Sequence, residues 1–177
     1  MNIIVFKRDG TWCHRPDSTL NHKYLDYYRP DYVASMEVVP VVYTRLVKAG
    51  KCIAPRFAQR YFNESAFGCL INDTTAGVSE AMASSMDFSS VMGMDFAPFG
   101  ALAESPLSLE IDGKACFKAT GAVTAEDFCR AISAISNRST IRLGDIVAIE
   151  VGAGAELNPG NTLSLICGAV RHDIKIF

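Results

Sequence analysis

The sequence predicts an α+β fold that is mostly β, with two or three short helices. Three observations support this prediction. Several strand-length segments are rich in β-branched and aromatic residues, the pair Asp112-Gly113 joins two of them as a hairpin, and Thr124-Ala125-Glu126-Asp127 resembles a capping box. Hydrophobic residues make up 49% and charged residues 20% of the 177 residues. This balance is typical of a folded protein and predicts one domain over residues 1–177.

The first part of the chain contains two predicted strands and one predicted helix. Residues 1–6 form a short apolar strand, and a polar, turn-rich stretch follows. Residues 37–48 are rich in valine, which predicts a long strand, and Pro40 within it indicates an edge position or a bulge. Pro55 suits the first turn of a helix. We expect this helix to pack its aromatic face inward, because apolar residues recur at helical spacing: Phe57, Ala58, Tyr61 and Phe62.

The second part adds six predicted strands and one predicted helix. Residues 67–71 form a buried strand, whereas residues 77–94 permit no structural prediction. Residues 107–111 and 115–118 form the two strands of the hairpin. A helix starts at Thr124, since apolar residues follow it at helical intervals. The predicted strands that complete the chain, set off by turns at Gly144 and Gly160, are residues 146–151, 162–168 and 173–177.

Charge and hydropathy exclude several classes of partner. Seventeen basic and nineteen acidic residues give a net charge of −2, and no run of like charge occurs. We therefore expect neither nucleic acid nor an anionic membrane as a partner. No apolar stretch approaches the ~20 residues that cross a bilayer, and residues 1–6 are too short for a secretion signal. We expect a cytoplasmic protein.

The cysteines and histidines form no metal-binding motif. The cysteines show no C-x-x-C spacing and lie mostly among apolar neighbours, so we expect reduced core residues. The histidines lie in polar surroundings and none pairs with a carboxylate at metal-ligand spacing, so we expect surface positions. The residues concerned are Cys13, Cys52, Cys69, Cys116, Cys129 and Cys167, and His14, His22 and His172.

Asp73 is the carboxylate of greatest interest in a sequence without a nucleophile elbow, P-loop or dinucleotide motif. It ends an apolar strand and precedes Thr74 and Thr75, a position from which a strand can present a ligand to a site. Alternatively, its side chain forms an Asx turn with the backbone two residues on. The residues themselves leave both interpretations open.

Several segments resemble the fumarylacetoacetate hydrolase family in order and spacing. Residues 15–20, Arg-Pro-Asp-Ser-Thr-Leu, resemble the family's Lys-Pro-Asp-Ser-Ala-Leu. Residues 50–62 are similar to Gly-Lys-Asn-Ile-Ala-Glu-Arg-Phe-Ala-His-Arg-Tyr-Tyr of one bacterial branch. Ile111-Asp112-Gly113-Lys114, the helix at Thr124 and Leu143-Gly144-Asp145 continue the match. The resemblance implies a mixed β-roll or sandwich with a divalent-metal site. It also implies hydrolysis, isomerisation or decarboxylation of 2,4-dioxo or 2-hydroxy-dienoate acids.

The positions that match the family's metal ligands have changed. The family's Glu-x-Glu pair corresponds to Val39 and Val41, which cannot ligate magnesium or calcium because these ions require oxygen donors. The family's Asp-x-Thr-Ala-Arg-Asp corresponds to residues 73–78, which keep Asp73 but lose the arginine and the second aspartate. The resemblance therefore implies a severely depleted metal site.

Further positions that match the family's active site have also changed. The active-site lysine corresponds to Met92, and the substrate-binding Gly-Thr-Pro turn corresponds to Glu150-Val151-Gly152. The family's N-terminal helix, which carries a His/Glu acid–base pair, has no room between Phe6 and Arg15. These changes predict a degenerate, non-catalytic member with no catalytic residue and no cofactor.

Two functions remain as hypotheses. The first is a binding or partner subunit that associates with itself or with a homologous subunit, and whose pocket holds a small carboxylate ligand. The apolar end of the chain, residues 174–177, suits either such an interface or the protein's own core. The second is an active metal-dependent hydrolase, isomerase or decarboxylase with a relocated site for Mg or Ca. Its ligands would be Glu37, which shares a strand face with Val39 and Val41, together with Asp73 and Glu150.

Overall fold

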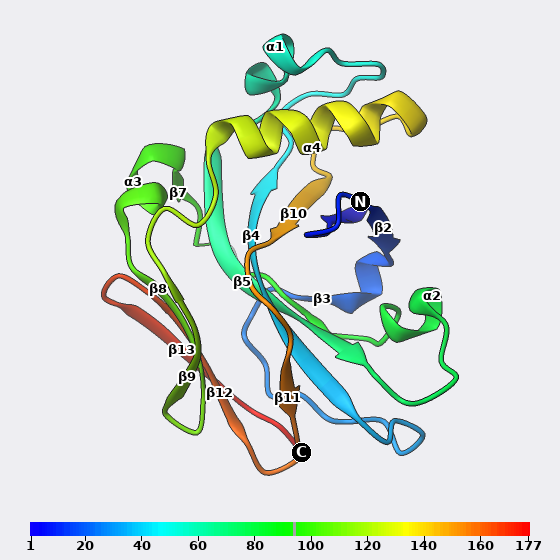
Figure 1. The fold of residues 1–177 in the computed structure, drawn as a ribbon, viewed down its shortest axis with the longest axis vertical. Helices are drawn as coiled ribbons and strands as arrows, with labels where there is room; N and C mark the ends of the chain where they lie inside the picture. Colours follow the sequence, from blue (N-terminus) through cyan, green and yellow to red (C-terminus); the bar gives the residue numbers. More distant parts are fainter. Residues whose placement is uncertain (94) are drawn as a thin grey trace.

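Two β-sheets and one long helix make up most of the structure (Figure 1). The computed structural model describes residues 1–93 and 95–177. The larger sheet has the order β2-β1-β10-β4-β5-β6-β3, with β11 beside β4 and β7 beside β5. Pairs β1–β10 and β3–β6 are parallel and the other pairs are antiparallel. Its strands are β1 (Ile3–Phe6), β2 (Trp12–Arg15), β3 (Leu20–Asn21), β4 (Met36–Arg45), β5 (Glu64–Asp73), β6 (Ser90–Val91), β7 (Ala97–Pro98), β10 (Ile146–Glu150) and β11 (Ala155–Leu157).

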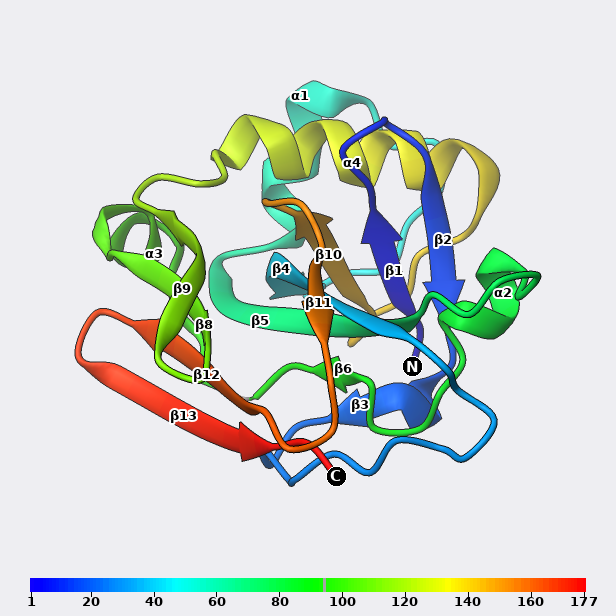
Figure 2. The ribbon, with the colours of Figure 1, turned by 60° about the horizontal axis from the view of Figure 1, so that its bottom comes forward.

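The smaller sheet is antiparallel and lies beside the strongly curved β5 (Figures 1 and 2). Its order is β13-β12-β8-β9, and the hairpin turn at Asp112-Gly113 has positive φ at both residues, as a tight hairpin requires. Its strands are β8 (Leu107–Ile111), β9 (Lys114–Ala119), β12 (Thr162–Cys167) and β13 (Val170–Lys175). The predicted α+β, mostly β fold class is confirmed.

Period-two alternation along the central strands separates two apolar clusters, one on each face of the larger sheet. On β4, Val42 belongs to the larger cluster and Val41 to the smaller one. Helix α4 (Ala125–Arg138) covers the larger cluster and packs on β10 through Phe128 and Ile132. The smaller cluster lies inside the roll that the larger sheet forms.

Arg15 links distant strands of the rolled sheet. It ends β2, at one edge, yet its guanidinium reaches the carbonyl oxygen of Ile71 on β5 and the hydroxyl of Ser89, next to β6. The 3-10 helix η1 (Asp17–Thr19) carries the chain from β2 to β3 and brings Thr19 Oγ1 within 2.8 Å of Ser90 Oγ. These contacts close the roll across its open side.

Pro40 occupies a central strand, so its predicted edge position is wrong, and the bulge interpretation describes it better. Strand β4 pairs with β5 on one side and with β10 and then β11 on the other. Between β10 and β11, residues 151–154 oppose only Val39 and Pro40. The carbonyl of Pro40 accepts a hydrogen bond from Val151 N on the side of β10 and β11. The N–H that proline lacks would point to the same side, where the ladder of hydrogen bonds is already interrupted.

The helices differ from the prediction in number and in one buried face. Residues 1–93 and 95–177 contain four α-helices, and among these only α4 exceeds two turns. The others are α1 (Pro55–Ala58), α2 (Glu80–Ala83) and α3 (Phe99–Glu104), and η2 (Gln59–Tyr61) is a 3-10 helix. Ala58 and Phe62 are buried, but Phe57 is 41% exposed, which corrects the inward orientation that we predicted for it. The α1 segment is one turn long, and Phe57 lies instead under the guanidinium groups of Arg56 and Arg60.

The segment 77–94, for which the sequence permitted no structural prediction, contains α2 and β6. Its last position lies outside the described residues.

The cysteines and histidines only partly match their predicted positions. All six cysteines are free, but Cys69 alone is buried, which corrects the predicted core positions of the others. Cys116, for example, is on the exposed face of β9, the edge strand of the smaller sheet. His14 and His22 are exposed as predicted, whereas His172 is half-buried against Tyr24. At the C-terminus, Ile174 and Ile176 are buried in the protein's own core. None of the helices in the described part of the chain is long and apolar enough to span a bilayer.

Candidate functional site

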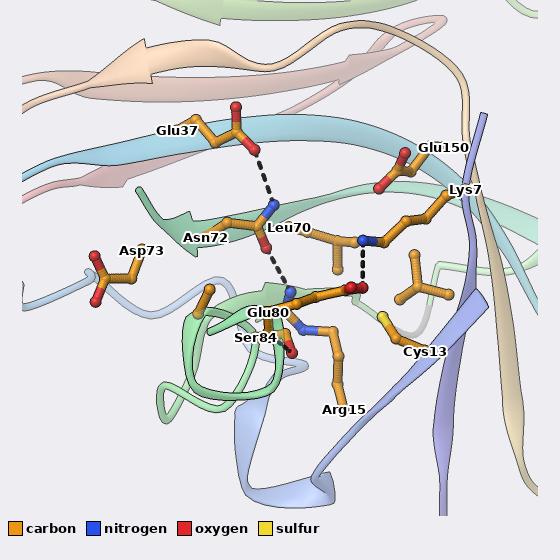
Figure 3. A pocket seen from close by; sticks show the side chains of 12 residues that line it. Lys7, Cys13, Arg15, Glu37, Leu70, Asn72, Asp73, Glu80, Ser84 and Glu150 are labelled. Carbon is orange, nitrogen blue, oxygen red and sulfur yellow. Dashed lines mark hydrogen bonds and ion pairs between the residues drawn. The ribbon is translucent and has the colours of Figure 1, made fainter. Parts of the chain in front are cut away.

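Two adjoining hollows form a cleft at the mouth of the roll. The inner one, about 160 Å³, lies between β2, β5 and α2, and the outer one, about 350 Å³, lies beside the bend of residues 151–154. We call them together the roll-mouth cleft, because both are lined by Lys7, Glu37, Asn72 and Glu150. Most of its charged side chains are drawn in Figure 3. The ionisable residues that line it are Lys7, Arg8, Asp9, Cys13, Arg15, Glu37, Asp73, Glu80 and Glu150.

Arg15 forms the back wall of the inner hollow. It is 2% exposed, and its Nη1 donates to Asn72 Oδ1 at 2.7 Å while its Nη2 donates to Ile71 O at 3.0 Å and Ser89 Oγ at 2.7 Å. Burial lowers the pKa of Arg15 to about 10, which still leaves it charged at neutral pH. Among the described residues, no carboxylate forms an ion pair with this guanidinium.

Asn72 connects Arg15 to Glu37. Its Nδ2 donates to Glu37 Oε1 at 3.2 Å, because Asn72 and Glu37 are opposite each other in the β4–β5 register and share a face (Figure 3). The second carboxylate oxygen of Glu37 lies against Gly154, where an added Cβ would be 2.1 Å from it. The position of Glu37 therefore depends on a neutral amide and on the absence of a side chain at residue 154.

Glu150 and Lys7 face the same cleft from β10 and from the end of β1. Burial raises the pKa of the half-buried Glu150, and the negative charge of Glu37 raises it further, against opposing contributions from the Arg8 N–H and Lys7. The Arg8 N–H lies 3.4 Å from Glu150 Oε2. Lys7 forms an ion pair with Glu80 of α2, which bridges the mouth of the cleft (Figure 3).

Asp73 borders the cleft but turns away from the other two carboxylates (Figure 3). It is paired with Met36, so it lies on the opposite strand face from Asn72 and Glu37. Its Oδ1 accepts from Thr75 N at 2.8 Å. This is the Asx turn, the second of the two interpretations that the sequence left open.

The residues at the cleft do not fit a divalent ion. Among the residues that the structure describes, no three His, Cys, Asp or Glu side chains are placed to hold a metal. Glu37 and Glu150 both border the outer hollow, but Val39 lies on the same wall. Val41, opposite Glu150, is fully buried in the smaller apolar cluster. Hard cations require several oxygen ligands, which these two valines cannot supply.

The other positions matched by resemblance also lack functional groups. Met92 is fully buried in the smaller cluster with Tyr43 and Leu70. Residues 7–15 form a turn and strand β2, so the described chain has no helix before η1. Glu150 ends β10, and Gly152 follows it in the bend, where an added Cβ would be 2.7 Å from both Pro40 and Phe117.

Sequence reasoning missed Lys7, Arg15, Asn72 and Glu80 as residues of this cleft. Asn72 directly precedes Asp73. Once the register with Glu37 is known, the alternation of strand side chains predicts that Asn72, and not Asp73, shares a face with Glu37. Lys7, Arg15 and Glu80 come together from three separate segments, and no local spacing indicates that. Glu37, Asp73 and Glu150 all line the cleft, but only Glu37 and Glu150 face it together.

No protein-family model and no curated protein matches the sequence. Solved structures match closely in fold. A Yersinia pestis CO92 protein described as belonging to the fumarylacetoacetate hydrolase family has TM-score 0.84 and 16% identity, covering 99% of this chain and 92% of its own. The 2-hydroxyhepta-2,4-diene-1,7-dioate isomerase from Mycobacterium marinum has TM-score 0.86 and 13% identity, covering 99% and 73%. The fumarylpyruvate hydrolase from Pseudomonas aeruginosa, in complex with Mn2+ and pyruvate, has TM-score 0.81 and 14% identity, covering 99% and 89%. The chain has the fold of these proteins.

Proposed function

We propose that this protein is a divergent member of the fumarylacetoacetate hydrolase family that binds a ligand or a partner and does not catalyse the family's reactions. The observation that carries the proposal is the apolar surface at the positions matched to the metal ligands and the lysine. Val39 lies on the wall of the roll-mouth cleft, and Val41 and Met92 are buried in one apolar cluster. Reactions through an enolate need positive charge where negative charge develops, and these side chains supply none.

The alternative is an active metal-dependent hydrolase, isomerase or decarboxylase of 2,4-dioxo or 2-hydroxy-dienoate acids with Glu37, Asp73 and Glu150 as ligands. Two observations favour it: the three carboxylates line one cleft, and a structure of the same fold binds Mn2+. It requires Asp73 to leave its Asx turn with Thr75 and rotate toward Glu37, since the two side chains lie on opposite strand faces.

Calorimetric titration with magnesium, manganese and calcium distinguishes the two functions. We expect no binding at millimolar ion and no turnover of acylpyruvates in the presence of these ions. One-to-one binding that is lost in both Glu37→Gln and Asp73→Ala, accompanied by turnover, would establish the alternative. Asp31→Asn, at an exposed position that lines neither hollow of the cleft, is the matched control and should behave as the unsubstituted protein.

The ligand that we propose for the cleft is a small carboxylate. Arg15 has no carboxylate partner among the described residues, and Lys7 could exchange Glu80 for the ligand. The four carboxylates that line the inner hollow would repel an anion, so we expect binding only where Lys7 is free to pair with it. Titration with pyruvate followed by NMR should shift the resonances of residues 70–73, and Lys7→Met should abolish the shifts. Shifts that persist in Lys7→Met would contradict this role.

Self-association, or association with a homologous subunit, belongs to the same proposal, as does a cytoplasmic location. The six free cysteines suit a reducing compartment. Tyr28 is 70% exposed and stacks on Phe177, which leaves an aromatic surface at the C-terminus. Light scattering after size exclusion should give a mass of two chains, and a single-chain mass at all concentrations would contradict self-association.

A further inference from the structure

A second cavity, of about 220 Å³, lies on the other face of the larger sheet, between β5, α3 and the β12–β13 pair. It shares no lining residue with the roll-mouth cleft. Its walls are apolar and include Phe67, Leu102 and Leu165, each at most 5% exposed. Phe67 and Leu70 are an odd number of residues apart on β5, which places the two cavities on opposite faces of that strand. We call this cavity the α3–β13 pocket.

Three polar side chains from separate segments meet at the rim of the α3–β13 pocket. The Tyr24 hydroxyl donates to Asp95 Oδ2 at 2.9 Å, and His172 Nε2 lies 2.8 Å from the same oxygen. The rings of Tyr24 and His172 stack with centroids 3.7 Å apart and planes within 8°. Both groups thus lie close to one oxygen of Asp95. Only Tyr24 donates a hydrogen bond to it, since the buried His172 Nε2 has no hydrogen-bond partner among the described residues.

The backbone around this rim is held in an unusual conformation. Tyr24 has φ of +53°, a region that bulky residues rarely adopt. Its hydroxyl fills the space where a side chain at residue 93 would lie, since a Cβ on Gly93 would be 2.1 Å from it. The same Gly93 accepts a hydrogen bond from Tyr43 through its carbonyl. The Tyr24 ring thus lies against Gly93 and is stacked on His172.

One acceptor at the rim has no partner within the described part of the chain. The Tyr24 and His172 contacts both use Asp95 Oδ2, and none of the described residues donates to Asp95 Oδ1. The Asp95 side chain is 56% exposed, so Oδ1 is accessible to a ligand. The hydroxyl of Ser105, the other polar side chain on the α3 wall, already donates to Ala101 O.

We propose that the α3–β13 pocket binds a small monocyclic aromatic amine, with the ring between Phe67, Leu102 and Leu165 and the ammonium group at Asp95. The size fits, because apolar cavities of about 150 Å³ bind benzene and this one has room for a short side chain in addition. The charge fits an amine and not a carboxylate, because Asp95 would attract the first and repel the second. This site is separate from the roll-mouth cleft, so the proposal does not depend on the function proposed above.

The test is a pair of matched probes, 2-phenylethylamine and 3-phenylpropanoate, which differ in the charge of the terminal group. Each is titrated into the protein and followed by NMR at Leu102 and Leu165. We expect the amine to bind about tenfold more tightly than the carboxylate. Equal affinities, a preference for the carboxylate, or no shifts at millimolar amine would overturn the proposal.

Two variants locate the site. Asp95→Asn keeps the shape and an acceptor oxygen but removes the charge, so the preference for the amine should disappear. Ala101→Trp, at an exposed position on the pocket wall, should block both probes. Asp31→Asn, which removes an exposed charge that does not line the pocket, should leave both affinities unchanged. If folded Asp95→Asn still binds the amine more tightly than the carboxylate, the ammonium group does not lie at Asp95 and the assignment is wrong. If a variant does not fold, the relative affinities of the two probes for the unsubstituted protein decide the question.

Discussion

Single residues at the roll-mouth cleft have a structural role that their charge alone does not indicate. Arg15 is a buried cation whose donors contact an amide, a carbonyl and a hydroxyl instead of a carboxylate. A charge buried without an opposite charge is costly unless hydrogen bonds replace its hydration. The three hydrogen bonds of Arg15 do so for its two terminal nitrogens and link β2 to β5 and to the start of β6, whereas its buried Nε has no partner among the described residues.

Arg15→Met should lower the free energy of unfolding by about 2–3 kcal/mol, because buried acceptors lose their donors while the alkyl packing is largely kept. Urea denaturation measures the change. Arg142→Met is the matched control, since Arg142 is exposed and its side chain makes no hydrogen bond or ion pair within the described residues, and it should change the stability by less than about 0.5 kcal/mol. Equal effects of the two substitutions would contradict a closing role for Arg15.

Glu150 should make the stability depend on pH. Burial, followed by the charge of Glu37, raises its pKa above the ordinary value of 4.5 in the folded protein. The folded state therefore binds this proton more tightly than the unfolded state, and the free energy of unfolding falls as the pH rises through the raised pKa. Glu150→Gln does not ionise, so it should be more stable than the unsubstituted protein at neutral pH.

The advantage of Glu150→Gln should shrink as the pH falls from the raised pKa toward 4.5, and it should be absent below 4.5, where Glu150 is protonated in both states. Chemical denaturation of both proteins across this range measures the difference. An advantage that is independent of pH would show that the glutamine acts through packing and not through the missing charge.

At the scale of elements, α4 is the helix whose start the sequence specifies most fully. Thr124 Oγ1 accepts from Asp127 N at 3.2 Å, and Asp127 Oδ2 accepts from Thr124 N at 2.8 Å. Although burial opposes it, the hydrogen bonds that the Thr124 hydroxyl and N–H donate to Asp127 Oδ2, joined by Arg130, lower the pKa of Asp127 and keep it charged near the positive end of the helix dipole. This capping box fixes where the helix that covers the larger apolar cluster begins.

Thr124→Ala should lower the free energy of unfolding by about 1 kcal/mol, because it removes the side-chain acceptor of the capping box. Thr120→Ala, four residues earlier at an exposed position without a side-chain hydrogen bond in the described structure, should have little effect. Thermal unfolding followed by circular dichroism compares the two. Similar losses in both variants would mean that the cap contributes nothing specific.

At the scale of the whole molecule, the roll requires close approach between its strands. Gly68 on β5 lies under both β6 and Tyr43, and an added Cβ would be 2.5 Å from the Val91 carbonyl oxygen and 2.9 Å from the Tyr43 ring. The closest of these neighbours is backbone, so it cannot move without opening the β5–β6 contact. The curl of the larger sheet, and with it the roll-mouth cleft, depends on this glycine.

Gly68→Ala should therefore lower the free energy of unfolding by about 2 kcal/mol. Gly100→Ala is the opposite control, because Gly100 lies in α3 with no atom within 4 Å of an added Cβ, and alanine favours helix by about 0.5–1 kcal/mol. Chemical denaturation should move the two midpoints in opposite directions. A stabilising effect of Gly68→Ala would contradict the packing described for the roll.

The sequence by itself determined the fold class, most strand positions and the start of α4, because these depend on local alternation, turn residues and caps. The alternative metal-site hypothesis grouped Glu37 and Glu150 with Asp73, and the structure places Glu37 and Glu150 together at one cleft. Only the tertiary structure decided that Asp73 turns away, since its face depends on the register with Met36. It alone brought Lys7, Arg15, Asn72 and Glu80 together, and Tyr24, Asp95 and His172 at a second pocket. Pairing between distant strands sets these contacts, and no spacing along the chain encodes that pairing.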